Sequence, residues 1–187
     1  MSTLKAAKRY AEMGFSVIPT KPRPDPDPKQ EAKRPALPAW KAYQDKRATE
    51  AELDAWWYRW PKAGVAIVTG AISGVVAIDL DNEEALAWGR ENLPPTPMVC
   101  KTGRGEHWYY RHPGIPVANG VGVVKGRKVD LRGDGGYVVA PPSIHPSGAV
   151  YEEIGDWRIA LQNLPPFPSS ELGKSTNSSA ALDIGIM

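Results

Sequence analysis

Proline and glycine interrupt this chain so often that it can hold only short helices and strands. Its 187 residues include 19 prolines and 18 glycines, about a fifth of the chain, against a usual share of ~12%. Proline fixes φ and removes a backbone donor, so the alternating prolines of segment 21–28 cannot sustain a helix or a sheet. We therefore expect an extended loop over residues 20–39. Apolar spacing and capping residues predict helices over 3–13, 49–60 and 82–92.

Short apolar runs between these breaks predict strands. The runs cover residues 15–18, 65–68, 75–78, 98–101, 107–110, 121–124, 128–131, 137–140 and 150–154. Helices come first and are then mixed with strands, which predicts an α+β domain. The Ser-rich composition near the end predicts a flexible tail or linker over residues 166–187, leaving 1–165 as the folded domain.

Composition excludes several classes of site. The single cysteine, Cys100, excludes an internal disulfide and a Cys-based zinc site, and three histidines argue against a poly-His metal site. A metal would therefore be held mainly by carboxylates, which favours Mg²⁺ or Mn²⁺ and no zinc. No apolar run is long enough to cross a membrane, and we expect a cytoplasmic protein. The net charge of +2 allows nucleic-acid binding only through a local basic surface.

The strongest local signal is an apolar strand that ends in Asp-x-Asp. Residues 75–78 lead directly into Asp79-Leu80-Asp81. Because side chains alternate along a strand, Asp79 and Asp81 should project from one face, about 7 Å apart along the backbone. Two such carboxylates can converge on divalent cations. The alternative is that Asp81 or Asn82 only caps the following helix.

Two further segments carry polar residues on predicted strands and turns. Segment 101–107 places two glycines between Lys101 and His107, which is typical either of a phosphate cradle or of a simple hairpin. Asp130 lies between two apolar residues, so it faces away from them and is a candidate third metal ligand. Asp134 lies in a Gly-rich turn and is expected to be structural. The Pro-rich loop 141–146 adds two residues that could contact a ligand or order the turn, Ser143 and His145.

The order of these features resembles the archaeo-eukaryotic primase superfamily. The resemblance is closest to its bifunctional primase/polymerase (prim-pol) branch, found in plasmid, prophage and viral replication proteins. The family's motifs are Asp-x-Asp, small-x-His and apolar-Asp, and they correspond here to Asp79/Asp81, Gly105–His107 and Val129–Asp130. The flanking segments 6–19, 33–40 and 137–143 are similar as well, so the resemblance covers about residues 4–158. The Pro-rich stretch 21–28 departs from the pattern and leaves the contacts of Lys33 and Arg34 open.

The resemblance implies a two-part fold and a reaction. An N-terminal α/β unit and an RRM-like catalytic unit would enclose the active site in a cleft, within a prim-pol catalytic domain over residues 1–165. The enzyme would transfer nucleotides from NTPs or dNTPs to a 3′-hydroxyl on single-stranded DNA, in replication of a mobile element or virus. Two Mg²⁺ or Mn²⁺ ions would be held by Asp79, Asp81 and Asp130, with His107 completing the catalytic set. The residues implied in nucleotide binding are Lys101, Thr102, Gly103, Arg104, Gly105, His107, Arg132, Ser143 and His145.

The resemblance implies DNA template, primer and nucleotides as partners, with a helicase domain or protein as a further candidate. It also implies that the chain is either part of a longer replication protein or a stand-alone prim-pol. Trp108, Tyr109 and Tyr137 are candidates for stacking on a base or sugar, although we expect at least one of them in the core. The candidate template contacts are two basic clusters, Lys5, Lys8 and Arg9, and Lys125, Arg127 and Lys128.

Three other classes of function compete with this one: a nickase or other metal-dependent nuclease, a non-catalytic nucleic-acid-binding domain and a nucleotide cyclase. A replication nickase would need a His-x-His pair, which His107, His112 and His145 do not form. A metal-dependent nuclease of another kind and a non-catalytic nucleic-acid-binding domain both remain open. A nucleotide cyclase would also use metal carboxylates, but segment 133–136 has the wrong order of glycine and acid.

Overall fold

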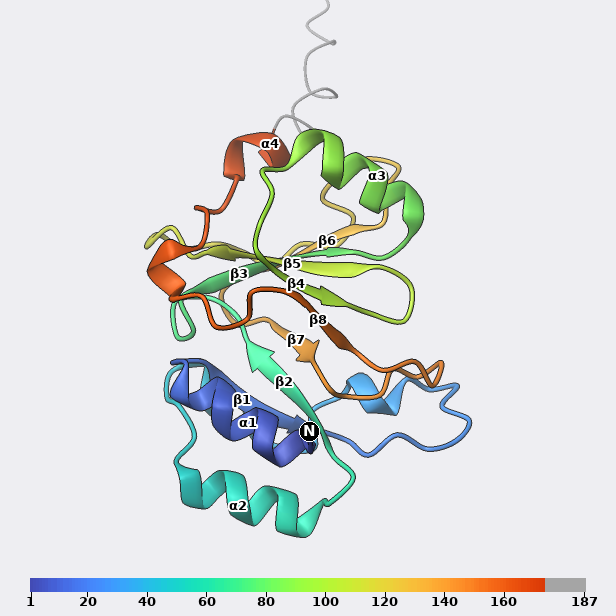
Figure 1. The fold of residues 1–187 in the computed structure, drawn as a ribbon, viewed down its shortest axis with the longest axis vertical. Helices are drawn as coiled ribbons and strands as arrows, with labels where there is room; N and C mark the ends of the chain where they lie inside the picture. Colours follow the sequence, from blue (N-terminus) through green and yellow to red (C-terminus); the bar gives the residue numbers. More distant parts are fainter. Residues whose placement is uncertain (174–187) are drawn as a thin grey trace, which may run out of the picture.

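The computed structural model describes residues 1–173, which form an α+β structure with two antiparallel sheets (Figure 1). The three-stranded sheet has the order β1-β2-β7 and the five-stranded sheet the order β6-β3-β5-β4-β8. The strands of the first are β1 (Ser16–Thr20), β2 (Gly64–Val68) and β7 (Tyr137–Ala140). Those of the second are β3 (Val75–Leu80), β4 (Met98–Lys101), β5 (Glu106–Arg111), β6 (Val129–Arg132) and β8 (Glu152–Gly155).

The longer helices begin at the capping residues that the sequence provides. Ser2 caps α1 (Thr3–Glu12), where the sequence predicts Thr3 as the cap. Thr49 forms a capping box with Glu52 at the start of α2 (Glu50–Arg59), as the sequence predicts. Asn82 caps α3 (Glu83–Asn92), so the helix-capping alternative for this segment holds for Asn82. The shorter helices are η1 (Glu31–Lys33), η2 (Trp40–Gln44), η3 (Leu161–Asn163) and α4 (Ser169–Gly173). No helix in residues 1–173 is both long and apolar enough to span a membrane.

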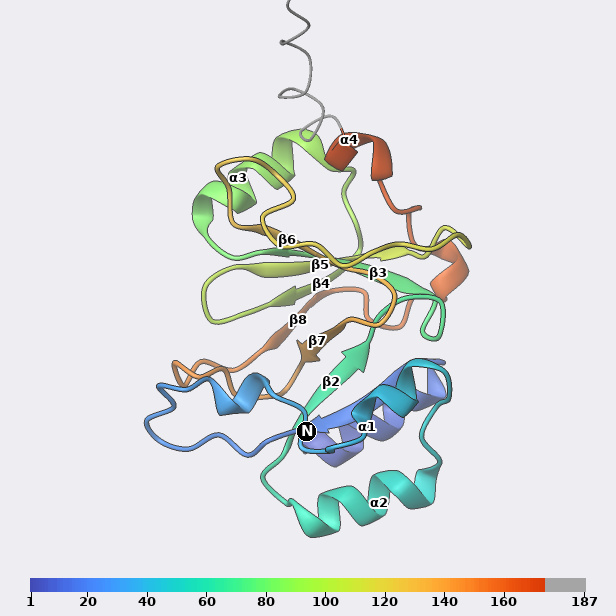
Figure 2. The same ribbon diagram turned by 180° about the vertical axis from the view of Figure 1, so that it is seen from behind.

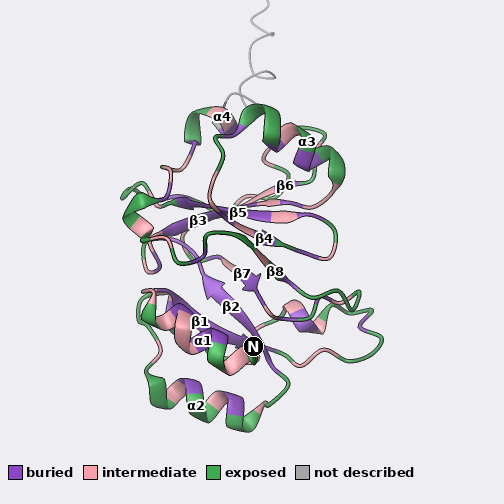
Figure 3. Cartoon of the chain, viewed as in Figure 1, coloured by how far each residue is buried: buried purple, intermediate pink, exposed green. Residues whose placement is uncertain are grey.

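Helices cover the outer side of each sheet (Figures 1 and 2). The α1 and α2 helices pack on the three-stranded sheet, whereas α3 and α4 lie over the five-stranded one. The largest apolar cluster joins the two sheets and includes Tyr10, Ile67, Ala77 and Tyr109. A second cluster lies between the five-stranded sheet and α3 and includes Ile78, Leu80 and Leu86. Strands β1, β2 and β3 are accordingly buried, whereas the edge strand β8 is largely exposed, as are the outer helix faces and loops (Figure 3).

One predicted strand is absent from the structure, and packed residues continue toward the C-terminus. Residues 121–124 do not form a strand, because Gly122 adopts a φ of +59° and turns the chain into a loop. The packed chain also continues beyond the expected boundary at residue 165. Phe167 and Leu172 pack in the apolar cluster under α3. The packed part of the chain therefore extends at least to residue 172. The remainder of the expected Ser-rich tail, residues 174–187, lies outside the described residues.

Candidate active site

Three polar side chains form a row across the middle of the five-stranded sheet. Asp79 on β3 lies directly opposite Asp130 on β6 and directly opposite His107 on β5. Residues directly opposite one another on antiparallel strands point to the same face, with Cα atoms about 4.5–5.5 Å apart. Asp79 is also the only residue of β3 that is not fully buried. The two carboxylates and the imidazole therefore share one face at a distance that a bound ligand can bridge.

Apolar residues on the same strands determine which face this row occupies. Ile78, Leu80 and Trp108 alternate with the polar row and pack in the cluster under α3. Because strand side chains alternate, burial of these residues forces Asp79 and His107 toward the three-stranded sheet. The polar row consequently faces residues that come from distant parts of the chain.

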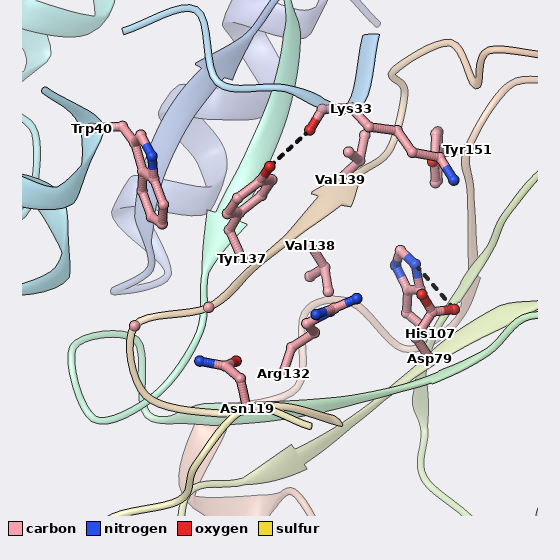
Figure 4. Close-up of a pocket in the computed structure, with 12 residues that line it drawn as sticks. Lys33, Trp40, Asp79, His107, Asn119, Arg132, Tyr137, Val138, Val139 and Tyr151 are labelled. Carbon is pink, nitrogen blue, oxygen red and sulfur yellow. Dashed lines mark hydrogen bonds and ion pairs between the residues drawn. The ribbon is translucent and has the colours of Figure 1, made fainter. Parts of the chain in front are cut away.

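A pocket of about 450 Å³ lies against this row (Figure 4). Its lining comprises Lys33, Trp40, Asp79, His107, Asn119, Arg132, Gly135, Gly136, Tyr137, Val138, Val139 and Tyr151. Asp79 and His107 lie side by side at one end, Trp40 and Tyr137 lie toward the other end, and Arg132 lies between the two groups. Both sheets and the segment after β1 contribute to the lining, so the pocket depends on the whole tertiary structure.

Burial and neighbouring charges set the protonation of the row. Burial is the main cause that raises the pKa of Asp79, and the charges of Asp81 and Asp130 raise it further while His107 opposes them. Burial also lowers the pKa of His107, and the positive charges of Lys33 and Arg132 lower it further, whereas the negative charge of Asp79 raises it. At neutral pH His107 is therefore an uncharged donor or acceptor between a carboxylate and two cations.

Each carboxylate of the predicted metal set has its own partner. Asp79 Oδ1 lies 3.7 Å from His107 Nε2, Asp81 is 3.0 Å from the Arg104 guanidinium, and Asp130 is 2.9 Å from that of Arg132. Asp130 also accepts a hydrogen bond from the amide of Gly122. Within residues 1–173, no three His, Cys, Asp or Glu side chains are placed together as a metal-binding group. Binding of a cation would therefore require at least some of these side chains to exchange partners.

The Gly-rich turn packs against both the Asp-x-Asp strand and the loop that carries His145. A β-carbon on Gly105 would lie 1.8 Å from the carbonyl oxygen of Leu80, and one on Gly103 would meet the His145 ring. Burial, with the nearby charges of Lys33 and Arg104, lowers the pKa of His145 to about 4. His145 is therefore neutral beside the turn and next to two cations.

Several other predicted nucleotide contacts lie outside the pocket. Lys101 pairs with Glu106 in the ladder, which places it on the opposite face from His107, and it forms an ion pair with Glu152 at 3.8 Å. Thr102 accepts hydrogen bonds from the amides of Arg104 and Gly105 and so orders the turn. Ser143 is bound to both backbone groups of Val65 and lines a second pocket.

Sequence reasoning missed four residues that line the pocket: Lys33, Trp40, Asn119 and Tyr151. The hydroxyl of Tyr137 donates to the carbonyl of Lys33, and Trp40 packs edge-on against the Tyr137 ring. Asn119 is held by the amide of Gly133 and the carbonyl of Asp134. Tyr151 lies in the predicted strand 150–154, whereas Lys33, Trp40 and Asn119 belong to no periodic pattern or predicted strand. Only the Lys33-Arg34-Pro35 and Trp40 flank pointed to this region.

The expected aromatic and basic contacts divide between core and surface. Trp108 and Tyr109 are buried in the two apolar clusters, as expected for at least one of the candidates, whereas Tyr137 lines the pocket. Asp134 is structural as expected, because it accepts from the amides of Ala71 and Val117. The candidate template clusters also make ion pairs: Lys8 with Glu50 and Asp54, Arg9 with Glu153, and Arg127 with Glu84.

Comparison with known proteins gives a family match over most of the chain. The model of the Prim-Pol family, described as the N-terminal domain of bifunctional DNA primase/polymerase, matches residues 7–169. This range contains both sheets and every residue of the pocket. A search among curated proteins gave no match.

Proposed function

The chain belongs to the Prim-Pol family of bifunctional DNA primase/polymerases, and we propose that the pocket beside Asp79 is its nucleotidyl-transfer site. In this proposal the pocket is the cleft between an N-terminal α/β unit and an RRM-like unit. The substrates are NTPs or dNTPs and the 3′-hydroxyl of a strand on a single-stranded DNA template. The observation that carries the proposal is the row of Asp130, Asp79 and His107 on one face of the sheet.

The acidic residues suit hard divalent cations. Asp79 and Asp130 are direct cross-strand partners, and the charge of Asp81 reaches Asp79. Carboxylate oxygens are the ligands that Mg²⁺ and Mn²⁺ prefer, and bound cations would replace the Arg104 and Arg132 guanidinium groups as partners of Asp81 and Asp130. We therefore assign Asp79, Asp81 and Asp130 as the residues that would hold two such ions. When bound, the ions would activate the attacking hydroxyl and stabilise charge on the leaving pyrophosphate.

The cations in and around the pocket suit the triphosphate. Lys33 and Arg132 both line the pocket, and both influence His107 electrostatically. The Nδ1 atom of His107 is buried and has no hydrogen-bond partner among residues 1–173. A neutral imidazole with a free nitrogen can form a hydrogen bond with a phosphate oxygen. Lys33 and Arg132 would neutralise the negative charge of the phosphate. The role of His107 in this proposal is phosphate binding rather than general base catalysis.

Tyr137 and Trp40 suit the nucleoside. They form an edge-to-face pair with ring centroids 5.0 Å apart, and they lie across the pocket from the carboxylates. Aromatic faces bind sugars and bases through stacking that tolerates different sequences. This orientation would leave the phosphates toward Lys33, Arg132 and His107.

The test is incorporation of labelled nucleotide on single-stranded DNA, with and without a primer, in Mg²⁺ or Mn²⁺. Replacing a metal ligand should reduce incorporation at least about 100-fold, so we expect this loss for Asp79→Asn and Asp130→Asn. Asp54→Asn on α2 is the matched control and should retain activity, because Asp54 lies outside the pocket lining and forms a surface ion pair with Lys8. Equal incorporation by Asp79→Asn and the wild-type protein would refute the assignment. Cleavage of the template without incorporation would favour the nuclease alternative.

A further inference from the structure

A second pocket lies beside the proposed active site and has a basic lining. It has a volume of about 260 Å³ and is found where β1 ends and β2 begins, at Thr20 and Gly64. Ala32 lines this pocket, and the next residue, Lys33, lines the first one. The two pockets are therefore neighbours along η1.

Three basic residues and no acidic residue line this second pocket: Lys21, Arg23 and Lys62. Lys21 is 2.6 Å from Glu31, and Arg23 is 3.0 Å from the exposed Asp25, but neither acid lines the pocket. Lys62 is exposed and has no charged or hydrogen-bonding partner in the described part of the chain. At least one full positive charge thus remains available at the pocket.

The pocket also contains a buried hydroxyl that has no partner. Thr20 is completely buried, and within residues 1–173 its Oγ1 atom makes no hydrogen bond. Burying a hydroxyl without a partner is unfavourable, and a ligand that accepts a hydrogen bond at this position would remove that cost. The absence of a side chain at Gly64 provides the space, since a β-carbon there would lie 2.4 Å from Thr20 Oγ1.

We infer that this pocket binds a phosphate group of the DNA strand, an inference that rests on the proposed function. The ligand must accept hydrogen bonds and carry negative charge, because the lining offers a hydroxyl donor and ammonium and guanidinium groups. Phosphate meets both requirements. The adjoining pocket has its own cations, Lys33 and Arg132, for the phosphates of the nucleotide. A DNA backbone that passes η1 can place a phosphate in the second pocket while its end reaches the first.

The experiment measures binding of a labelled oligothymidylate and, separately, of dTTP, without turnover and over a range of salt concentrations. Lys62→Ala should lower the slope of log K against log salt by about 0.7 for the oligonucleotide, the value for one phosphate contact on a single strand. Thr20→Val should weaken oligonucleotide binding about tenfold, as expected for a lost hydrogen bond to a charged group. It should not reduce the stability of the fold, because the hydroxyl has no partner to lose. Lys29→Ala is the matched control, since Lys29 is an exposed lysine of the loop between β1 and η1 and lies outside both pockets.

Each result decides the inference. It is supported if Lys62→Ala and Thr20→Val weaken oligonucleotide binding relative to Lys29→Ala while dTTP binding is unchanged. It is overturned if Lys62→Ala behaves as Lys29→Ala does, or if Thr20→Val destabilises the protein and leaves affinity intact. Weaker dTTP binding with unchanged oligonucleotide binding would assign the pocket to nucleotide phosphates and overturn the DNA assignment. Because the experiment measures binding and not turnover, its result can support or overturn the DNA-phosphate site even if the protein shows no nucleotidyl transfer.

Discussion

Gly105 should couple the stability of the Gly-rich turn to the position of the carboxylates. In Gly105→Ala the new β-carbon would lie 1.8 Å from the carbonyl oxygen of Leu80 and 3.1 Å from the Cα of Asp81. Carbon–oxygen contacts normally lie near 3.3–3.6 Å, so the two backbone segments must separate by about 1.5 Å. No rotamer can relieve a contact with backbone. We expect a loss near the upper end of the overpacking range, about 3 kcal/mol in the free energy of unfolding.

The same displacement should reduce activity more than it reduces the folded fraction. Leu80 lies between Asp79 and Asp81, so movement of its carbonyl shifts both carboxylates. A misplacement of about 1 Å can cost about 100-fold in rate, and we expect a loss of that size in nucleotide incorporation at a temperature where the variant remains folded. Urea denaturation followed by circular dichroism gives the stability, and single-turnover incorporation gives the activity.

Gly114→Ala is the control for this variant. Gly114 has a φ of +79° but no neighbouring heavy atom within 4 Å, so alanine there should cost only about 1 kcal/mol from backbone conformation. Activity should be unchanged. The reasoning is refuted if Gly105→Ala loses no more stability than Gly114→Ala, or if it retains full activity when folded.

Three further predictions concern the turn at Asp134, the aromatic side of the pocket and the C-terminal packing. Burial raises the pKa of Asp134, but hydrogen bonds from the amides of Val117 and Ala71 and from His112 outweigh burial, so the pKa in the folded protein is lowered. The stabilisation of the folded protein by ionised Asp134 should be complete above the ordinary pKa of ~3.9 and should disappear as the pH falls through the folded pKa. Urea denaturation against pH should show this loss in the wild type and a smaller one in Asp134→Asn. Tyr137→Phe removes the hydrogen bond to the Lys33 carbonyl and should raise the KM for nucleotide about three- to tenfold, with an unchanged KM contradicting the positioning role. Leu172→Ala should lower the free energy of unfolding by about 2–3 kcal/mol, and a loss below about 0.5 kcal/mol would mean that Leu172 is not packed in the folded protein.

The sequence was sufficient to predict the strands that carry the site but not how they pair. The apolar runs around Asp79, His107 and Asp130 correctly predict three strands, because burial on both faces requires continuous or alternating apolar residues. The run at 121–124 shows the limit of that signal, since Gly122 takes a left-handed conformation that ends any strand. Periodicity also could not place Lys33, because tertiary contacts hold its segment at the pocket, among them the hydrogen bond from the Tyr137 hydroxyl to the Lys33 carbonyl.

The register of the five-stranded sheet connects core packing to the position of the site. A slip of one residue between β3 and β6 would place Val129 or Leu131 opposite Asp79 and would turn Asp130 toward α3. Val129 is completely buried in the cluster under that helix, and Leu131 packs against it. Such a slip would bury a carboxylate among apolar side chains and bring apolar groups to the pocket, both of which are costly. The residues that build the core therefore also fix Asp130 beside Asp79, so the carboxylate row requires no contact of its own to hold it in place.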